Sequence, residues 1–174
     1  MALPGGVRRL PGGVFRVRLS TRERDLLAAL PAQLRPLLSG ASDLATPTGR
    51  VTDRLFPSAY DDPLDELEYR DLVGTQIGED RLAAVEDFAR TLEGGTTRRS
   101  TWTAELTGEQ AEAWLSALND ARLTFATVLG VTDESAWEHG PDRRNPTSVA
   151  LHYLGWLQEE LLGALSGTSD ATRE

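Results

Sequence analysis

The pattern of apolar and polar positions is most regular in QAEAWLSALNDARLTFATVLGV, residues 110–131. Residues at spacings of three and four fall there on one face of a helix: Ala111, Leu115, Leu118, Arg122, Phe125 and Leu129. Five of the six suit a face that packs into a core. Because arginine keeps its charge, burial of Arg122 requires acidic partners elsewhere in the fold. We expect a central core helix that carries a buried ion pair.

Alternating apolar residues predict a small sheet. Residues 7–19 alternate on either side of the turn Pro11-Gly12-Gly13, which predicts a hairpin with one face toward a core and a basic outer face. The stretch RRSTWTAEL, residues 98–106, is rich in β-branched and aromatic side chains and predicts one further strand. Capping boxes follow at residues 20–23 and 107–110, so a helix should begin at each.

Helical spacing predicts the remaining elements. A first helix should follow residue 20 and break near Leu30, because Pro31 removes a hydrogen-bond donor. Further helices are expected at residues 62–73, 82–92 and 145–165, the first and last opened by Asp-Pro and Asn-Pro caps. Polar, glycine-containing stretches predict loops at 40–52 and 137–148.

These elements predict an α+β fold that is mostly α. A small antiparallel sheet, made of the N-terminal hairpin plus one further strand, should pack against about five helices. A chain of 174 residues, 40% of them hydrophobic, suits one core. We therefore expect a single domain over residues 1–166 and a disordered C-terminal tail at 167–174.

The composition excludes several kinds of chemical site but does not identify a function. The chain has no cysteine, which excludes disulfides, thiolate metal sites and cysteine nucleophiles. All 18 basic residues are arginine, so no lysine Schiff base can form. A formal charge of −9 argues against a general nucleic-acid binder. Since neither a signal sequence nor a membrane span is visible, we expect a cytoplasmic protein.

Nine polar residues form the first candidate site: Arg54, Tyr60, Asp61, Asp62, Glu66, Glu68, Arg70, Asn119 and Arg122. They could line a pocket for a small anion or for carboxylate acid–base chemistry. They could instead be a buried ion-pair network that ties the middle of the chain to the central helix. No nucleophile and no metal-ligand spacing accompanies them, so we favour the network and expect no catalytic residue, cofactor or metal.

The second candidate is the basic N-terminal region. Residues 1–25 hold six arginines against two acidic residues, whereas the rest holds 12 against 25. Arg16 and Arg18, on the outer face of the hairpin, could bind an acidic partner or a nucleic-acid backbone, or simply face solvent. Because the acidic remainder repels DNA, we expect the partner to be another protein.

Aromatic residues of the last helix form a third candidate. Tyr153 and Trp156, with Trp137 before the helix, could form an interaction surface or complete the core, and periodicity does not decide between them. The two histidines, His139 and His152, lack the spacing of a zinc site.

Several blocks together resemble a known family. RLFPSAYDDP and ELEYR, then WLSALNDARLTFATVLGV, then YLGWLQEELL, are similar to an actinobacterial family of uncharacterised proteins, a domain of unknown function, over roughly residues 14–165. The resemblance implies no activity, cofactor or site residues. It implies a place near regulated proteolysis, because members are commonly encoded beside the adaptor that delivers N-degron substrates to the Clp protease. Some members carry the label of transcriptional regulator.

Three hypotheses of function follow. The first is a non-enzymatic protein-interaction or regulatory module. The second is a DNA-binding transcriptional regulator that uses the basic hairpin. The third is a small-anion sensor or enzyme that uses the Arg/Asp/Glu cluster. Partner identity and oligomeric state do not follow from the sequence.

Overall fold

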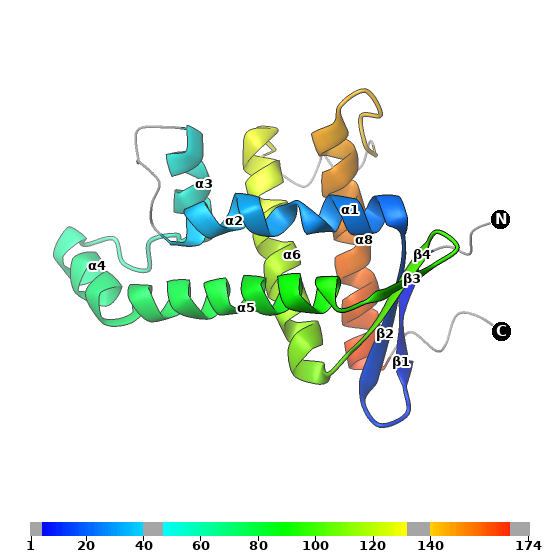
Figure 1. The fold of residues 1–174 in the computed structure, drawn as a ribbon. Helices are drawn as coiled ribbons and strands as arrows, with labels where there is room; N and C mark the ends of the chain where they lie inside the picture. Colours follow the sequence, from blue (N-terminus) through cyan, green and yellow to red (C-terminus); the bar gives the residue numbers. More distant parts are fainter. Residues whose placement is uncertain (1–4, 40–46, 132–139, 168–174) are drawn as a thin grey trace.

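A four-stranded antiparallel sheet lies at one end of the computed structural model, and helices make up the rest (Figure 1). The structure describes residues 5–39, 47–131 and 140–167, with the backbone alone for 47–50. The strands are β1 (Gly6–Leu10), β2 (Val14–Ser20), β3 (Thr96–Arg98) and β4 (Thr101–Leu106), in the order β1-β2-β4-β3. The fold is α+β and mostly α, as the sequence predicts.

The sheet has one apolar and one polar face. Its inner face is buried in the core, through Val7, Phe15, Val17, Leu19, Trp102 and Leu106. The predicted hairpin is present, with β1 paired to β2. The single strand predicted at residues 98–106 is wrong in detail, because the chain turns back at Arg99-Ser100 and forms two paired strands, β3 and β4.

Four helices begin close to where the sequence predicts, three of them at predicted caps and one after the predicted break. They are α1 (Thr21–Ala28), α2 (Leu30–Leu38), α6 (Gly108–Val128) and α8 (Pro146–Ser166). Both capping boxes form, and the Asn145 side chain accepts from the backbone N–H groups at the start of α8. The expected break between the first two helices lies at Ala29. Side-chain caps therefore mark the starts of α1, α6 and α8, as the sequence predicts.

The middle of the chain is more helical than predicted. It forms α3 (Pro47–Leu55), α4 (Pro63–Tyr69), the π-helical turn η1 (Arg70–Gly74) and α5 (Thr75–Glu93). Residues 47–52 were expected in a loop; instead they begin α3, which packs on α6 and buries Val51 and Leu55, four residues apart. None of the helices in the described ranges is both long and apolar enough to span a membrane.

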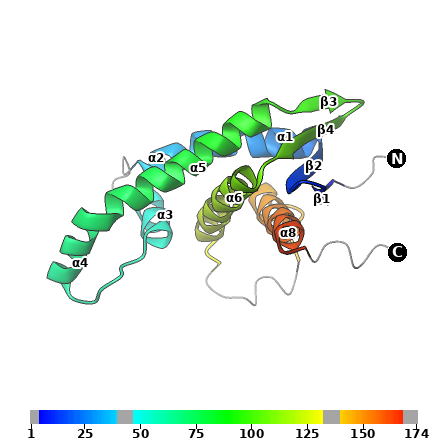
Figure 2. The ribbon, with the colours of Figure 1, turned by 90° about the horizontal axis from the view of Figure 1, so that it is seen from below.

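Helix α6 lies at the centre of the molecule, as the sequence predicts, and packs against α3, α5 and α8 (Figure 2). Its buried face differs from the predicted stripe. The fully buried positions include Trp114, Ala117, Leu118 and Ala121, whereas Leu115, Arg122 and Phe125 are only half-buried at its edge. Most of the buried positions of α6 are alanines, which carry a weaker apolar signal than the leucines of the predicted stripe.

An aromatic cluster joins the sheet to the helices. The Trp102 ring of β4 stacks on Trp114 of α6 with centroids 6.1 Å apart, and Phe88 of α5 meets Trp114 edge-on at 4.8 Å. Trp114 Nε1 donates to Thr91 Oγ1 at 2.7 Å. Gly95, between α5 and β3, lies so close to Trp102 that a Cβ there would overlap the indole ring. The entry of the chain into the sheet therefore requires glycine at this position.

Candidate functional site

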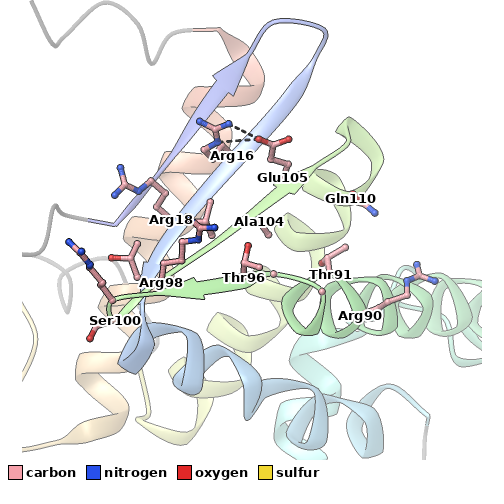
Figure 3. A pocket seen from close by; sticks show the side chains of 15 residues that line it. Arg16, Arg18, Arg90, Thr91, Thr96, Arg98, Ser100, Ala104, Glu105 and Gln110 are labelled. Carbon is pink, nitrogen blue, oxygen red and sulfur yellow. Dashed lines mark hydrogen bonds and ion pairs between the residues drawn. The ribbon is translucent and has the colours of Figure 1, made fainter.

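The outer face of the sheet carries an open groove of about 1480 Å³ (Figure 3). We call it the arginine groove, because five arginines line it: Arg16, Arg18, Arg90, Arg98 and Arg99. Threonine hydroxyls from β3 and β4 lie between them, and Glu105 is the one carboxylate among the described residues of its lining. The groove is therefore strongly basic on a chain whose net charge is −9.

Strand alternation and register place these side chains together. Arg16 and Arg18 alternate with buried residues of β2, so both point outward. Thr103 of β4 pairs with Arg18 on one side and with Thr96 of β3 on the other, which puts all three on the same face. Arg98 lies two residues beyond Thr96 and so shares that face. Pairing of distant segments thus builds a site that no single stretch contains.

Only part of this positive charge is neutralised within the chain. Arg16 pairs across strands with Glu105, Nη2 to Oε1 at 2.6 Å and Nε to the same oxygen at 3.2 Å. Arg90 pairs with Asp87 in the helical turn before it. The other three arginines make no ion pair with any residue that the structure describes: Arg18, Arg98 and Arg99. Their guanidinium groups remain available to an anionic ligand.

The turn between β3 and β4 has an unusual backbone. Arg99 and Ser100 have φ angles of 48° and 68°, the left-handed pair of a two-residue hairpin that Asn-Gly usually provides. Residues with a Cβ cost free energy in this region, and such strain is often kept at functional sites. Arg99, in this turn, is one of the residues that line the groove. Sequence reasoning missed it because Arg-Ser carries no turn signal.

The two predicted interaction surfaces differ in exposure. Arg16 and Arg18 line the arginine groove as exposed side chains. Tyr153 and Trp156 of α8 are half-buried against the core, with ring centroids 5.7 Å apart. The Tyr153 hydroxyl has no hydrogen-bond partner among the described residues, and burial, with Glu23 nearby, raises its pKa. A role of either pair in binding stays a prediction.

Part of the nine-residue polar cluster forms a local network at α4. Asp62 caps the helix by accepting from Leu64 N at 2.8 Å and Asp65 N at 3.2 Å. Glu66 accepts from Tyr60 N at 3.0 Å and from Arg70 Nε at 2.6 Å. These contacts, the ion pair with Arg70 first, lower the pKa of Glu66. Two further members of the cluster are exposed: Asp61 and Glu68.

The rest of that cluster lies elsewhere. Arg54 Nη1 donates to the Val131 carbonyl at 2.8 Å, which ties α3 to the end of α6. Arg122 Nη1 donates to Gln158 Oε1 of α8 at 2.5 Å, and Asn119 is half-buried. The structure thus does not gather the nine residues into one pocket.

Among the residues whose side chains the structure describes, Asp120 is the charged one that the core buries, with 1% of its surface exposed. Its Oδ1 lies 3.7 Å from Arg81 Nη1 of α5, and its Oδ2 has no hydrogen-bond partner among the described residues. Burial raises the pKa of Asp120 to about 6, against the opposing charge of Arg81. Arg81 also donates to the Leu55 carbonyl and lies 5.0 Å above the Phe56 ring, so it joins α3, α5 and α6.

A second, smaller cleft of about 250 Å³ lies at the start of α8. His152 is among its lining residues, and its Nδ1 lies 2.9 Å from the Ser148 carbonyl oxygen. His139 and Trp137, two further sequence candidates, fall outside the described residues. Asp142 and Ser148 also line the cleft, and the Ser148 hydroxyl accepts from the Asp142 backbone N–H at 3.0 Å.

Comparisons with known proteins place this fold in a family. The model of the family DUF2017, a domain of unknown function, matches residues 4–165. A Mycobacterium leprae (strain TN) protein named "Putative oxidative stress regulator AosR" is 34% identical over 131 residues, which are 72% of this chain and 56% of that protein. The chain thus spans little more than half of this relative. No solved structure matches. The chain belongs to the DUF2017 family.

Proposed function

We propose that this chain is a non-enzymatic regulatory protein that binds an acidic segment of another protein in the arginine groove. One observation carries the proposal: Arg18, Arg98 and Arg99 lie together on an open sheet face without acidic partners among the described residues. Guanidinium groups bind carboxylates through paired, charge-assisted hydrogen bonds. Threonine hydroxyls beside them add further donors.

The lining of the groove favours binding over catalysis. Its described residues include no histidine, and its single carboxylate, Glu105, is held in the pair with Arg16. A nucleophile and a general base within reach of each other are therefore missing from the described lining. The name of the M. leprae relative supports a regulatory role. This chain has no cysteine, so regulation through it would run by binding and not by oxidation of a thiol.

Direct binding measurements test the proposal. The probes are a fluorescein-labelled glutamate-rich peptide and a labelled DNA duplex of random sequence, titrated with the whole chain. We expect the peptide to bind, and the Arg18→Gln/Arg98→Gln variant to lose affinity by about tenfold or more, the effect of removing two charged donors. Arg143→Gln/Arg144→Gln is the matched control, because it removes two exposed arginines that do not line the groove. Equal loss in both variants, or no peptide binding, would contradict the proposal.

A DNA-binding regulator is the second candidate. The observation in its favour is that Arg90, Arg98 and Arg99 extend the basic face beyond the predicted hairpin. Phosphate contacts predict binding that weakens steeply as the salt concentration rises. If the wild type binds the duplex more tightly than the peptide, and the Arg18→Gln/Arg98→Gln variant loses affinity for both, DNA binding becomes the favoured function.

The family resemblance alone supports a finer proposal, that the partner belongs to regulated proteolysis. Affinity capture from a host lysate, with the Arg18→Gln/Arg98→Gln variant as bait in parallel, tests it. A Clp component that the wild type recovers and the groove variant does not would support the link. Recovery by neither bait would remove it.

A further inference from the structure

The N-terminal end of α5 carries a second exposed feature, which we call the acidic knob: residues 60–73, comprising three residues before α4, α4 itself and η1 up to residue 73. None of the residues of α4 is buried. Leu64, Leu67 and Leu72 are 76%, 61% and 75% exposed. The main contact of α4 within the described chain is with η1 (Figures 1 and 2). Exposed leucines gathered on one projecting element mark a surface for another molecule.

The knob keeps its shape without a core. Asp62 caps α4, and Glu66 accepts from the backbone of Ala59 at 2.8 Å and of Tyr60 at 3.0 Å, so the preceding segment is held against the helix. The Tyr60 and Tyr69 rings meet edge-on with centroids 5.6 Å apart. A helix formed before binding loses less conformational entropy when it docks. The leucines are therefore presented on a preorganised surface.

Charge restricts what can cover these leucines. Residues 60–73 hold six carboxylates and one arginine, and that arginine, Arg70, is paired with Glu66. A second knob would bring two acidic surfaces together, which disfavours a symmetric contact. Charge complementarity therefore favours a basic surface as the one that covers the knob.

The chain itself carries such a surface. The arginine groove holds five arginines against one carboxylate, and the aliphatic stems of its arginines can pack on leucine side chains. The knob cannot reach the groove of its own molecule. The two are separated by the 19-residue helix α5, which is about 28 Å long. The two features lie at opposite ends of the molecule (Figure 1).

We propose that the acidic knob of one molecule docks into the arginine groove of a second copy, so that the chain associates head to tail. The inference rests on the same groove as the proposed function. An assembled groove is covered, so self-association and the acidic partner compete for it. Because the two contacting surfaces differ, the association continues into short chains or rings.

A mixing experiment tests the contact. The knob variant is Leu64→Ser/Leu67→Ser, and the groove variant is Arg18→Glu/Arg98→Glu. In sedimentation equilibrium the wild type should exceed its monomer mass of 19.0 kDa as its concentration rises, and return to it in high salt. Each variant alone should stay at 19.0 kDa. An equimolar mixture should form a complex of twice that mass, because it contains one intact knob and one intact groove.

The controls separate this inference from the proposed function. Arg143→Glu/Arg144→Glu should associate like the wild type, since neither arginine lines the groove. Circular dichroism checks that the variants are folded. A wild type that stays at 19.0 kDa throughout overturns the inference. The inference is also overturned if the groove variant still dimerises while the knob variant does not, because that result indicates a symmetric contact between two knobs. Peptide binding by the monomeric knob variant would leave the proposed function standing in either case.

Discussion

The two ends of α5 are built in opposite ways. At the sheet end, basic side chains project from the outer face of a sheet whose inner face is buried. Trp102 on that inner face is 2% exposed, and its ring stacks on Trp114. At the knob end, acidic and apolar side chains project from α4, none of whose residues is fully buried and whose start is capped by Asp62. The net charge of −9 hides this separation. Formal charge therefore says less about partners than the place of each charge on the scaffold.

The largest effect on stability should come from removing the Trp102 ring, which packs beneath the sheet. Trp102→Ala leaves a large cavity between the sheet and α6, and it should lower the free energy of unfolding by about 3–5 kcal/mol. Urea titration followed by fluorescence measures this loss. A change below about 1 kcal/mol would mean that the sheet does not rest on this ring.

A pH effect should arise between the two ends, at the buried Asp120. The pKa of Asp120 is about 6 in the folded protein, against an ordinary value of 3.8 that applies in the unfolded chain. At a pH between these two values, the folded state therefore keeps a proton that the unfolded state releases. The free energy of unfolding should therefore fall by about 3 kcal/mol as the pH rises from about 4 to above 6. Asp120→Asn should remove this loss.

The difference between Asp120→Asn and wild type isolates this effect from the other carboxylates, which titrate in both proteins. Asp25→Asn is the matched control, because the Asp25 side chain is 70% exposed. Denaturant titrations at several pH values measure the difference. A constant difference across the window would show that Asp120 is not perturbed in the folded state.

A smaller effect should follow from a single methyl group at the join of α5 and β3. Gly95→Ala forces a Cβ into the Trp102 ring, and overpacking of this kind costs about 1–3 kcal/mol. Gly108→Ala is the control, because a Cβ at Gly108 has nothing within contact distance. Thermal melts of the two variants should differ in midpoint, and equal midpoints would contradict the close approach.

The smallest effect should be at the knob. Leu64→Ala removes a side chain that is 76% exposed, so the free energy of unfolding should change by less than about 0.5 kcal/mol. A loss as large as that of Gly95→Ala would mean that α4 packs on the body of the protein in solution. The comparison between the two ends would then fail.

Local signals predicted much of the fold. The capping boxes at Ser20 and Thr107 and the cap at Asn145 set helix starts correctly, because side chains within one turn satisfy the free backbone groups. Alternation in the hairpin also predicted which residues point outward, including Arg16 and Arg18. Two of the five groove arginines could thus be predicted from one segment.

The rest depends on contacts between distant segments. Arg98 joins Arg18 only because β4 pairs with β2 and β3, and no local pattern specifies that pairing. Residues 47–52 looked like a loop by composition, but burial of Val51 overrides that preference. In α6, alanines occur on several faces, so periodicity does not identify the buried face. The sequence therefore predicted Arg122 as the buried charged residue, whereas the core buries Asp120.

The most direct test of the central claim is an amide NMR titration of the whole-chain Leu64→Ser/Leu67→Ser variant, which should not self-associate, with the glutamate-rich peptide. Binding in the arginine groove predicts chemical-shift changes concentrated in β2, β3 and β4, with Thr96, Thr103 and the Arg99-Ser100 turn among them, and little change in α4. Shifts confined to another surface, or no shifts at all, would contradict the assignment of the groove as the binding site.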